Sequence, residues 1–153
     1  MKISKKGEYA LKALIELAIN YDKGKALTLV DEIVERDNIP PMYLEQILLS
    51  LESGGIVISK RGVGGGYSLV RSPEDISLGE VIRIVEGPLA PLNCVSVKAH
   101  VNCPEESTCG LYSIMREVRD AIANILDNIS LKDLVKRTLA LREKKEGILS
   151  YAI

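Results

Sequence analysis

The order of elements between residues 28 and 71 constrains the fold of this chain more than any other feature. A short amphipathic helix is predicted from about residue 30, and Pro40 and Pro41 separate it from a second helix that reaches about Glu52. Two β-prone runs follow directly, joined by a glycine-rich segment over residues 61–66. This succession of a short helix, a tight turn, a longer helix and a glycine-rich hairpin is typical of a winged helix-turn-helix.

Capping patterns predict where the other helices begin. Apolar residues at helical spacing indicate a helix over residues 7–21. Thr28 with Asp31 is a shortened capping box before the short helix, and Ser77 with Glu80 is a full capping box that predicts a helix ending near residue 87. The head of the molecule is therefore expected to be built from four helices and one hairpin.

The C-terminal half is predicted to hold a loop and a long helix. Residues 88–109 show no period and contain three prolines and all three cysteines, so we expect a loop there. From Gly110 onward apolar residues recur in steps of three and four for about five turns. Ser130 and Asp133 predict one more short helix, and residues 142–146 are expected to fray.

The apolar stripe of the long helix is wider than one chain needs, which predicts a homodimer formed through it. The alternative is a helix packed only on its own domain. The predicted fold class is mainly α: a winged helix-turn-helix with a two-stranded wing and a long C-terminal dimerisation helix. The expected divisions are residues 1–87 for the DNA-binding domain, 88–109 for a cysteine loop, and 110–153 for the dimerisation helix and C-terminal tail. The stripe consists of Leu111, Ile114, Met115, Val118, Ala121, Ile122, Ile125, Leu126 and Ile129.

Composition restricts the core and the compartment. The chain has no Trp and no Phe, so its core must be built from aliphatic side chains. The first six residues lack an apolar signal segment and no apolar run approaches the roughly 18 residues of a membrane span, which predicts a cytoplasmic protein.

The net charge is only -1, but residues 2–12 hold four lysines against one glutamate, and residues 54–72 hold three cations and no acid. These two basic islands could converge on a phosphate backbone.

The second helix and the hairpin supply candidate DNA contacts. Glutamine can pair with adenine, glutamate can accept from cytosine, and serine can contact a base or a phosphate. Cations beside glycines suit a wing that approaches phosphates or the minor groove. A nucleotide-binding loop is disfavoured because no GK[ST] follows the glycines and they lead into a strand. The candidates are Met42, Glu45, Gln46 and Ser50 on the helix, with Lys60, Arg61, Gly64 and Gly65 in the hairpin.

The three cysteines, Cys94, Cys103 and Cys109, fall within one 16-residue stretch. An odd number of cysteines in a chain without an export signal argues against a disulfide framework. Thiolates could hold an iron–sulfur cluster, a zinc ion could take His100 as a fourth ligand, and a thiol switch needs no metal. The residues alone leave these three alternatives open. A metal- or thiol-dependent enzyme is disfavoured because His100 has no neighbouring acid to orient it, the nearest being Glu105.

Three stretches carry a resemblance to a known family: residues 1–10 (MKISKKGEYA), 43–48 (YLEQIL) and, most closely, 61–69 (RGVGGGYSL). They resemble the Rrf2 family of bacterial transcriptional regulators, which includes IscR, NsrR and CymR, over roughly residues 1–137. The resemblance implies a homodimer that binds palindromic double-stranded DNA operators and is not an enzyme. It places Tyr43, Glu45 and Gln46 at the major groove, Arg61 at the minor groove, and Ser4 and Lys5 near phosphates.

The same resemblance implies an IscR- or NsrR-like member whose operator affinity is controlled by an iron–sulfur cluster, expected to be [2Fe-2S], on the three cysteines. Where IscR-like members have a histidine after the last cysteine, this chain has Tyr112, a phenol that is neutral at neutral pH. Other members use a carboxylate near the partner's N-terminus, and Glu8 occupies that place here. Zinc, thiol-based redox control and control by a partner protein without a cluster are the alternatives.

Overall fold

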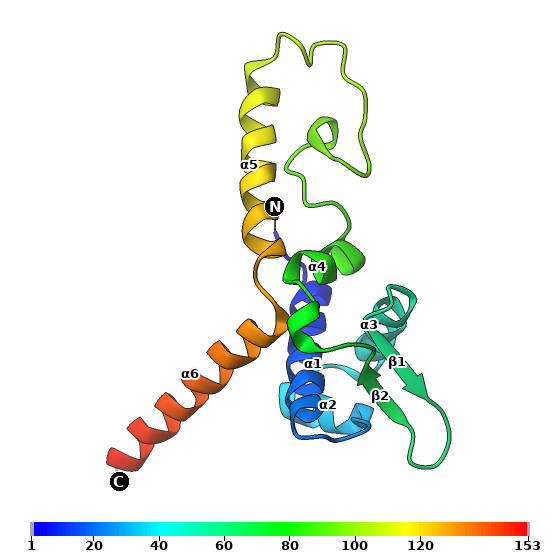
Figure 1. The fold of residues 1–153 in the computed structure, drawn as a ribbon, viewed down its shortest axis with the longest axis vertical. Coiled ribbons are helices and arrows are strands. Elements are labelled where there is room, and N and C mark those ends of the chain that lie inside the picture. The colour runs from blue at the N-terminus through cyan, green and yellow to red at the C-terminus, as the bar shows by residue number, and fades with distance from the viewer. Residues whose placement is uncertain (1, 153) are drawn as a thin grey trace.

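The computed structural model describes residues 2–152, which form a mainly helical fold with a two-stranded antiparallel sheet (Figure 1). The predicted fold class is confirmed. The helices are α1 (Lys5–Asp22), α2 (Val30–Asp37), α3 (Pro41–Ser53), α4 (Leu78–Glu86), α5 (Gly110–Asp127) and α6 (Leu131–Tyr151). The strands β1 (Val57–Lys60) and β2 (Gly66–Leu69) pair with Val57 opposite Leu69, and single turns of 3-10 helix form at η1 (Pro73–Asp75) and η2 (Asn93–Val95).

Helix α1 runs through the centre of the head and packs against α3, α4 and α6 (Figure 1). Its buried alanines, Ala10, Ala13 and Ala18, lie on one side of the helix and let its neighbours approach closely. The core is aliphatic, as the composition requires, and burial of each large side chain contributes about 1.5–3 kcal/mol. Its fully buried members include Leu14, Leu17, Ile33, Ile39, Leu44, Ile47, Leu48, Leu51, Ile56, Ile76 and Leu131.

The turn between α2 and α3 depends on Asn38 and two prolines. Asn38 adopts a left-handed conformation with φ of 51° and ends α2, a position that asparagine tolerates better than most residues. Pro40 and Pro41 then begin α3, as predicted, because proline fits the first turn of a helix. The two helices of the predicted helix-turn-helix are therefore joined by a short, rigid connection.

Two capping predictions need correction. Thr28 does not cap α2, because the N-cap residue is Leu29 and no side chain accepts a bond from this helix end. Ser77 caps α4 as predicted and accepts from the Glu80 N–H at 3.1 Å. The carboxylate of Glu80 does not complete the box, since it pairs with Arg71 at 2.5 Å. A charge-assisted bond to Arg71 thus replaces the bond to the N-cap backbone that the pattern predicted.

Helix α6 is much longer than the short helix predicted after residue 130. The capping box of Ser130 and Asp133 forms as predicted. The helix then continues through residues 142–146, which were expected to fray, and projects away from the head (Figure 1). This stretch is rich in strong helix formers, so the helix persists with little core contact. Arg142 holds it to α1 through an ion pair with Glu16 at 2.8 Å.

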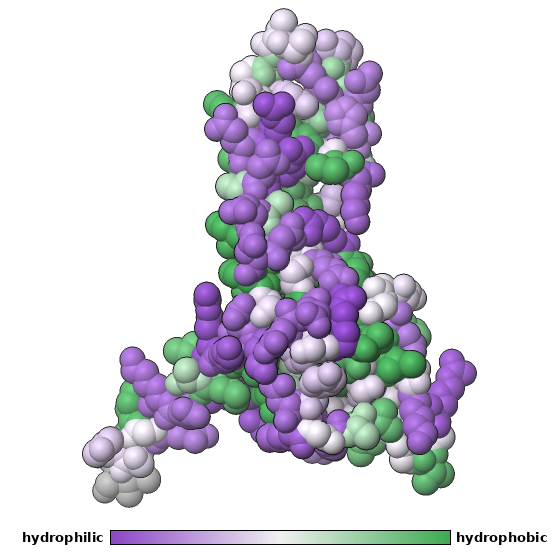
Figure 2. Space-filling view, viewed as in Figure 1, coloured by the Kyte–Doolittle hydropathy of each residue, from purple (hydrophilic) through white to green (hydrophobic). Residues whose placement is uncertain are grey.

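Helix α5 extends from the head beside residues 88–109, and none of its side chains is buried (Figure 1). Its predicted stripe divides into two faces. Met115, Ile122 and Leu126 are half-buried against the same chain, where α5 packs on α4 and η2. The other face looks outward, and Figure 2 shows hydrophobic surface along this edge of the molecule. Spaced by three and four, its members are Leu111, Ile114, Val118, Ala121 and Ile125.

Candidate nucleic-acid interface and cysteine segment

Helix α3 buries one side in the core and turns the other to solvent. Helical periodicity alone would put Tyr43 on the apolar side of α3, whereas the resemblance puts it at the major groove; in the structure it is 53% exposed and lies on the outward side. The exposed side therefore offers aromatic, acidic and amide groups suited to base edges. Its predicted contact residues are exposed at Met42, Glu45 and Gln46 and half-buried at Ser50.

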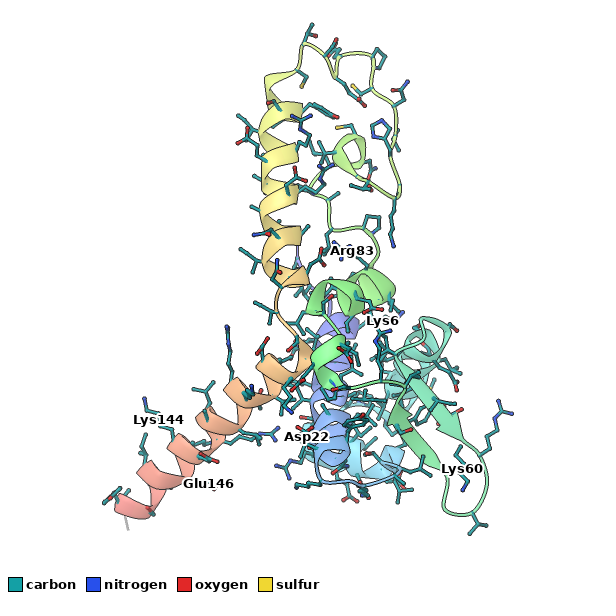
Figure 3. The ribbon with its side chains drawn as sticks, in the orientation of Figure 1. Lys6, Asp22, Lys60, Arg83, Lys144 and Glu146 are labelled. Atoms are coloured by element: carbon teal, nitrogen blue, oxygen red, sulfur yellow. The ribbon has the colours of Figure 1, made fainter. Side chains whose placement is uncertain are left out.

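The N-terminus of α1 lies against this outward side of α3. Lys6 Nζ donates to Ser50 Oγ at 3.4 Å, and the Tyr9 ring meets the Tyr43 ring edge-on with centroids 6.3 Å apart. Figure 3 shows Lys6 near α3. These contacts place the basic first turn of α1 beside the candidate recognition helix.

The capping turn of α1 carries the predicted phosphate contacts. Ser4 is the N-cap residue, and its hydroxyl accepts from the Gly7 N–H at 3.2 Å. Lys5 is exposed and pairs with Glu8 at 2.8 Å, and Lys12 pairs with the same carboxylate at 3.0 Å. Hydrogen bonds from Lys5 and then Lys12 lower the pKa of Glu8, and its bond to Glu8 raises the pKa of Lys5. Both charges are therefore firmly present at neutral pH.

The hairpin β1–β2 forms a wing with a glycine-rich tip. Gly62 and Gly64 have φ of 95° and 74°, a region that glycine enters at little cost. A Cβ on Gly65 would clash with the carbonyl oxygens of Lys60 and Gly62. The tight tip leaves Lys60 and Arg61 exposed, and Figure 3 shows Lys60 at the end of the wing that lies away from α1.

Two contacts fix the wing relative to α3. Glu52, near the end of α3, accepts from the Ser59 N–H at 2.9 Å and from the Ser59 hydroxyl at 2.6 Å. These bonds lower the pKa of Glu52. The backbones of Thr28 and Tyr67 exchange two further bonds of 2.8 and 2.9 Å, which tie β2 to the chain before α2. Glu52 therefore joins the wing to α3, and the bond from Lys6 to Ser50 joins α3 to the start of α1.

The predicted DNA contacts lie on three separate stretches of sequence: the start of α1 and the wing are each in contact with α3, which lies between them in this chain of contacts. Sequence reasoning missed two further groups on this face, the half-buried Lys6 and the exposed Val63. Lys6 belongs to the basic N-terminal stretch that had already been noted, so its charge was the available signal. Val63 stands at the wing tip with a fully exposed side chain. An apolar residue between glycines at a wing tip is a candidate for insertion into a groove.

The three cysteines lie on the segment between α4 and α5, and all are half-buried and free of disulfides. Cys94 lies in η2, whereas Cys109 is the N-cap of α5, where its Sγ accepts from the Tyr112 N–H at 3.4 Å. Cys103 lies between them in the sequence, and its backbone N–H donates to the Glu106 carboxylate at 3.1 Å.

His100 does have an acidic neighbour, contrary to expectation. Its Nε2 lies 3.1 Å from the Glu106 carboxylate, which the fold of the loop brings back toward it. Even so, no three His, Cys, Asp or Glu side chains among residues 2–152 of one chain are placed to hold a metal ion. A shallow hollow of about 640 Å³, lined by Cys109, Tyr112 and Arg116 among others, lies at the start of α5. One chain therefore supplies thiols here without a complete set of metal ligands.

A helix-turn-helix joined to a glycine-rich wing and a basic helix start defines a DNA-binding protein of the winged helix-turn-helix class. Residues 3–137 match the Rrf2 family model, described as an iron-dependent transcriptional regulator. The chain belongs to the Rrf2 family and is a DNA-binding transcriptional regulator.

Known relatives agree with this assignment. An rrf2-like HTH-type transcriptional regulator of Rhodobacter capsulatus is 41% identical over 138 residues, which are 87% of this chain and 91% of that protein. The structure of CymR, the global cysteine regulator of Bacillus subtilis, has a TM-score of 0.72 at 35% identity, covering 90% of this chain and 98% of CymR. The structure of T. potens IscR has a TM-score of 0.70 at 32% identity, covering 90% and 88%. These relatives are named as regulators, not enzymes.

Within residues 2–152 the helices are too short or too polar to cross a membrane.

Proposed function

We propose that the chain binds palindromic operator DNA as a homodimer and that the chemical state of Cys94, Cys103 and Cys109 sets its operator affinity. Residues 1–87 act as the DNA-binding domain, residues 88–109 as the sensing segment and residues 110–153 as the dimerisation arm and tail. The observation that carries the proposal is the position of three free, half-buried thiols on the one segment that joins the head to α5. A change at these thiols alters the connection between the dimer arm and the DNA-facing head.

Operator recognition is assigned to the face built by α3, the wing and the start of α1. Bases in the major groove are read from α3, the wing reaches the minor groove, and the start of α1 contacts phosphates. The basic, glycine-bounded wing and the lysines at the α1 N-terminus support this division. The residues assigned are Ser4, Lys5, Met42, Tyr43, Glu45, Gln46, Ser50, Lys60, Arg61, Gly64 and Gly65.

An iron–sulfur cluster is the group that we assign to the cysteines. Thiols are its usual ligands, the family model is described as iron-dependent, and an IscR is among the similar structures. The chemistry of the donors fits a cluster, since three thiols are free and Glu8 is held as a carboxylate by its lysine partners. Bound there, a cluster supplies sensitivity to iron supply and oxidation.

The fourth ligand is assigned to Glu8 of the partner subunit. One chain lacks a complete ligand set, which is the reason for seeking a donor from a second copy. A carboxylate that left Lys5 and Lys12 for this purpose would free both cations, and Lys5 is a proposed phosphate contact. Ligation at Glu8 would therefore change the charge that faces the DNA.

Control by the thiols themselves, without a cluster, is the second candidate. The similarity to CymR, titled the global cysteine regulator of Bacillus subtilis, favours it. So does Cys109 as the N-cap of α5, because a chemical change at its sulfur acts directly on the first turn of that helix. The two candidates share the same three residues and differ in whether iron is bound.

The visible spectrum after anaerobic assembly with iron and sulfide separates these candidates. We expect a coloured protein, and we expect Cys94→Ala, Cys103→Ala or Cys109→Ala each to remove most of the absorbance, since each removes one cluster ligand. Ser107→Ala, on the same segment, serves as the control and should keep the colour. A colourless parent protein that changes operator affinity on thiol oxidation would establish the thiol candidate instead. Iron retention equal to the parent's in all three cysteine variants would contradict the cluster assignment.

A further inference from the structure

The last residue of α4 is hydrogen-bonded to the first turn of α1. Glu86 Oε1 accepts from the Ser4 N–H at 2.8 Å and from the Ser4 hydroxyl at 2.6 Å. The Ser4 hydroxyl in turn accepts from the Gly7 N–H at 3.2 Å. One carboxylate from a segment 82 residues away thus organises the capping turn that carries the predicted phosphate contacts.

Gly7 makes room for this carboxylate. A Cβ at this buried position would clash with Glu86 Oε1 and with the Ile3 side chain. Gly7 does not have a positive φ, so the Glu86 and Ile3 side chains, rather than backbone conformation, occupy the space that a Cβ would need here. Glycine weakens the first turn of α1, and this cost is offset by the bonds that Glu86 makes.

The same arrangement recurs where α4 meets α5. Arg83 forms two bonds to the Asp127 carboxylate, of 2.5 and 2.9 Å, and Figure 3 shows Arg83 between α4 and the base of α5. A Cβ on the buried Gly79 would clash with Asp127 Oδ1. The hydrogen bonds lower the pKa of Asp127 and raise that of Arg83, so this ion pair persists across the physiological range. Each end of α4 is therefore fixed by a carboxylate that packs against a glycine: Glu86 against Gly7 of α1, and Asp127 of α5 against Gly79.

We propose that α4 is the rigid connector between the α5 arm and the DNA-facing start of α1, and that Glu86 is the positioning residue at its DNA end. Glu86 contacts no DNA in this account. It holds Ser4, and with it the adjacent Lys5 and Lys6, in register with α3, to which Lys6 is bonded through Ser50. The proposal rests on the proposed function in two respects: the start of α1 contacts DNA, and α4 carries the signal from the cysteine segment, which begins directly after it.

The first test compares operator affinity in two variants of Glu86. We expect Glu86→Ala to weaken binding about tenfold, since it removes two charge-assisted hydrogen bonds that order the capping turn. Glu86→Gln should stay within about threefold of the parent protein, because the amide oxygen can still accept both bonds. Glu146→Ala removes the same charge from the projecting half of α6 (Figure 3) and serves as the control.

These variants also separate positioning from charge. If the Glu86 carboxylate acted only by repelling phosphates, both Glu86→Ala and Glu86→Gln would bind DNA more tightly than the parent protein. That result, or an unchanged affinity for Glu86→Ala, would overturn the proposal. Retained helical circular dichroism in each variant excludes simple unfolding as the cause of a loss.

The second test asks whether a change at the α5 end of α4 reaches α1. Asp127→Ala breaks the bond to Arg83, and we expect amide hydrogen exchange at Ser4 and Gly7 to accelerate about threefold or more, because both amides are protected through the Glu86 contact. Asp127→Asn keeps one acceptor for Arg83 and should change exchange less. Unchanged exchange at the start of α1 in Asp127→Ala would show that α4 does not transmit a change from α5 to α1. Both tests leave the cysteines unmodified. Their outcomes therefore do not depend on whether the cysteines control operator affinity.

Discussion

Glutamates at Ile114 and Ile125 should convert the protein into a folded monomer that has lost specific operator binding. Both side chains lie on the outward face of α5, with 58% and 57% of their surface exposed within one chain. The fold of the single chain therefore does not depend on them. If this face pairs with its copy, the double variant buries four unpaired carboxylates in one symmetric interface, each costing several kcal/mol. Operator affinity should fall by on the order of a hundredfold or more, toward the non-specific level.

Light scattering and circular dichroism measure the two parts of this expectation. Ser113→Glu with Asn124→Glu adds the same charge to the polar side of α5, where both residues are exposed, and should remain dimeric. A stable dimer of the Ile114→Glu, Ile125→Glu variant would mean that the outward face is not the dimer contact. The inward residue Ile122 is a poorer position for this test, because it is half-buried against its own chain.

Arg61→Ala should weaken operator binding by about 1–3 kcal/mol, which is roughly 5- to 150-fold in Kd. The reason is the exposed position of Arg61 in the glycine-bounded wing, whose strand β1 is bonded to α3 through Glu52 and Ser59, so that the backbone carrying the guanidinium is held in place beside α3. If Arg61 reads base edges, the loss is confined to the specific site. If it contacts only phosphate, binding to all sequences weakens together and the salt dependence falls by about one charge.

Titrations of operator and random DNA at several salt concentrations distinguish these cases. Lys144→Ala removes a cation from the projecting part of α6, far from the wing (Figure 3), and should leave both affinities near those of the parent protein. Parent-like binding of Arg61→Ala to both DNAs would remove Arg61 from the interface.

The DNA-binding head was predictable because its signals are local. Helical periodicity, the prolines before α3 and the glycines of the wing each specify a neighbouring stretch of backbone, and the order of these stretches is specific to the fold. The register of the hairpin then follows from the glycine-rich tip. Outward residues of α3 could be chosen in advance for the same reason, although periodicity alone would have put the exposed Tyr43 on the buried side.

Contacts between distant segments could not be predicted. The pairing of Glu86 with Ser4 and of Arg83 with Asp127 depends on how helices pack, and the small residues that permit it, Gly7 and Gly79, look like ordinary helix weakeners in the sequence. The length of α6 was missed for another reason. Its distal half has helix-forming residues but no apolar stripe to mark it, so propensity rather than burial extends the helix.

Operator affinity of a single preparation before and after loss of the cysteine-bound group tests the central claim most directly. The protein is assembled anaerobically with iron and sulfide, titrated with operator DNA selected from random sequence, and titrated again after iron is removed by a chelator. The account predicts that the two dissociation constants differ by about tenfold or more, as expected for coupling between two sites, and that Cys103→Ala shows no such difference. Equal dissociation constants before and after iron removal in the parent protein, with cluster loss verified by its spectrum, would contradict it.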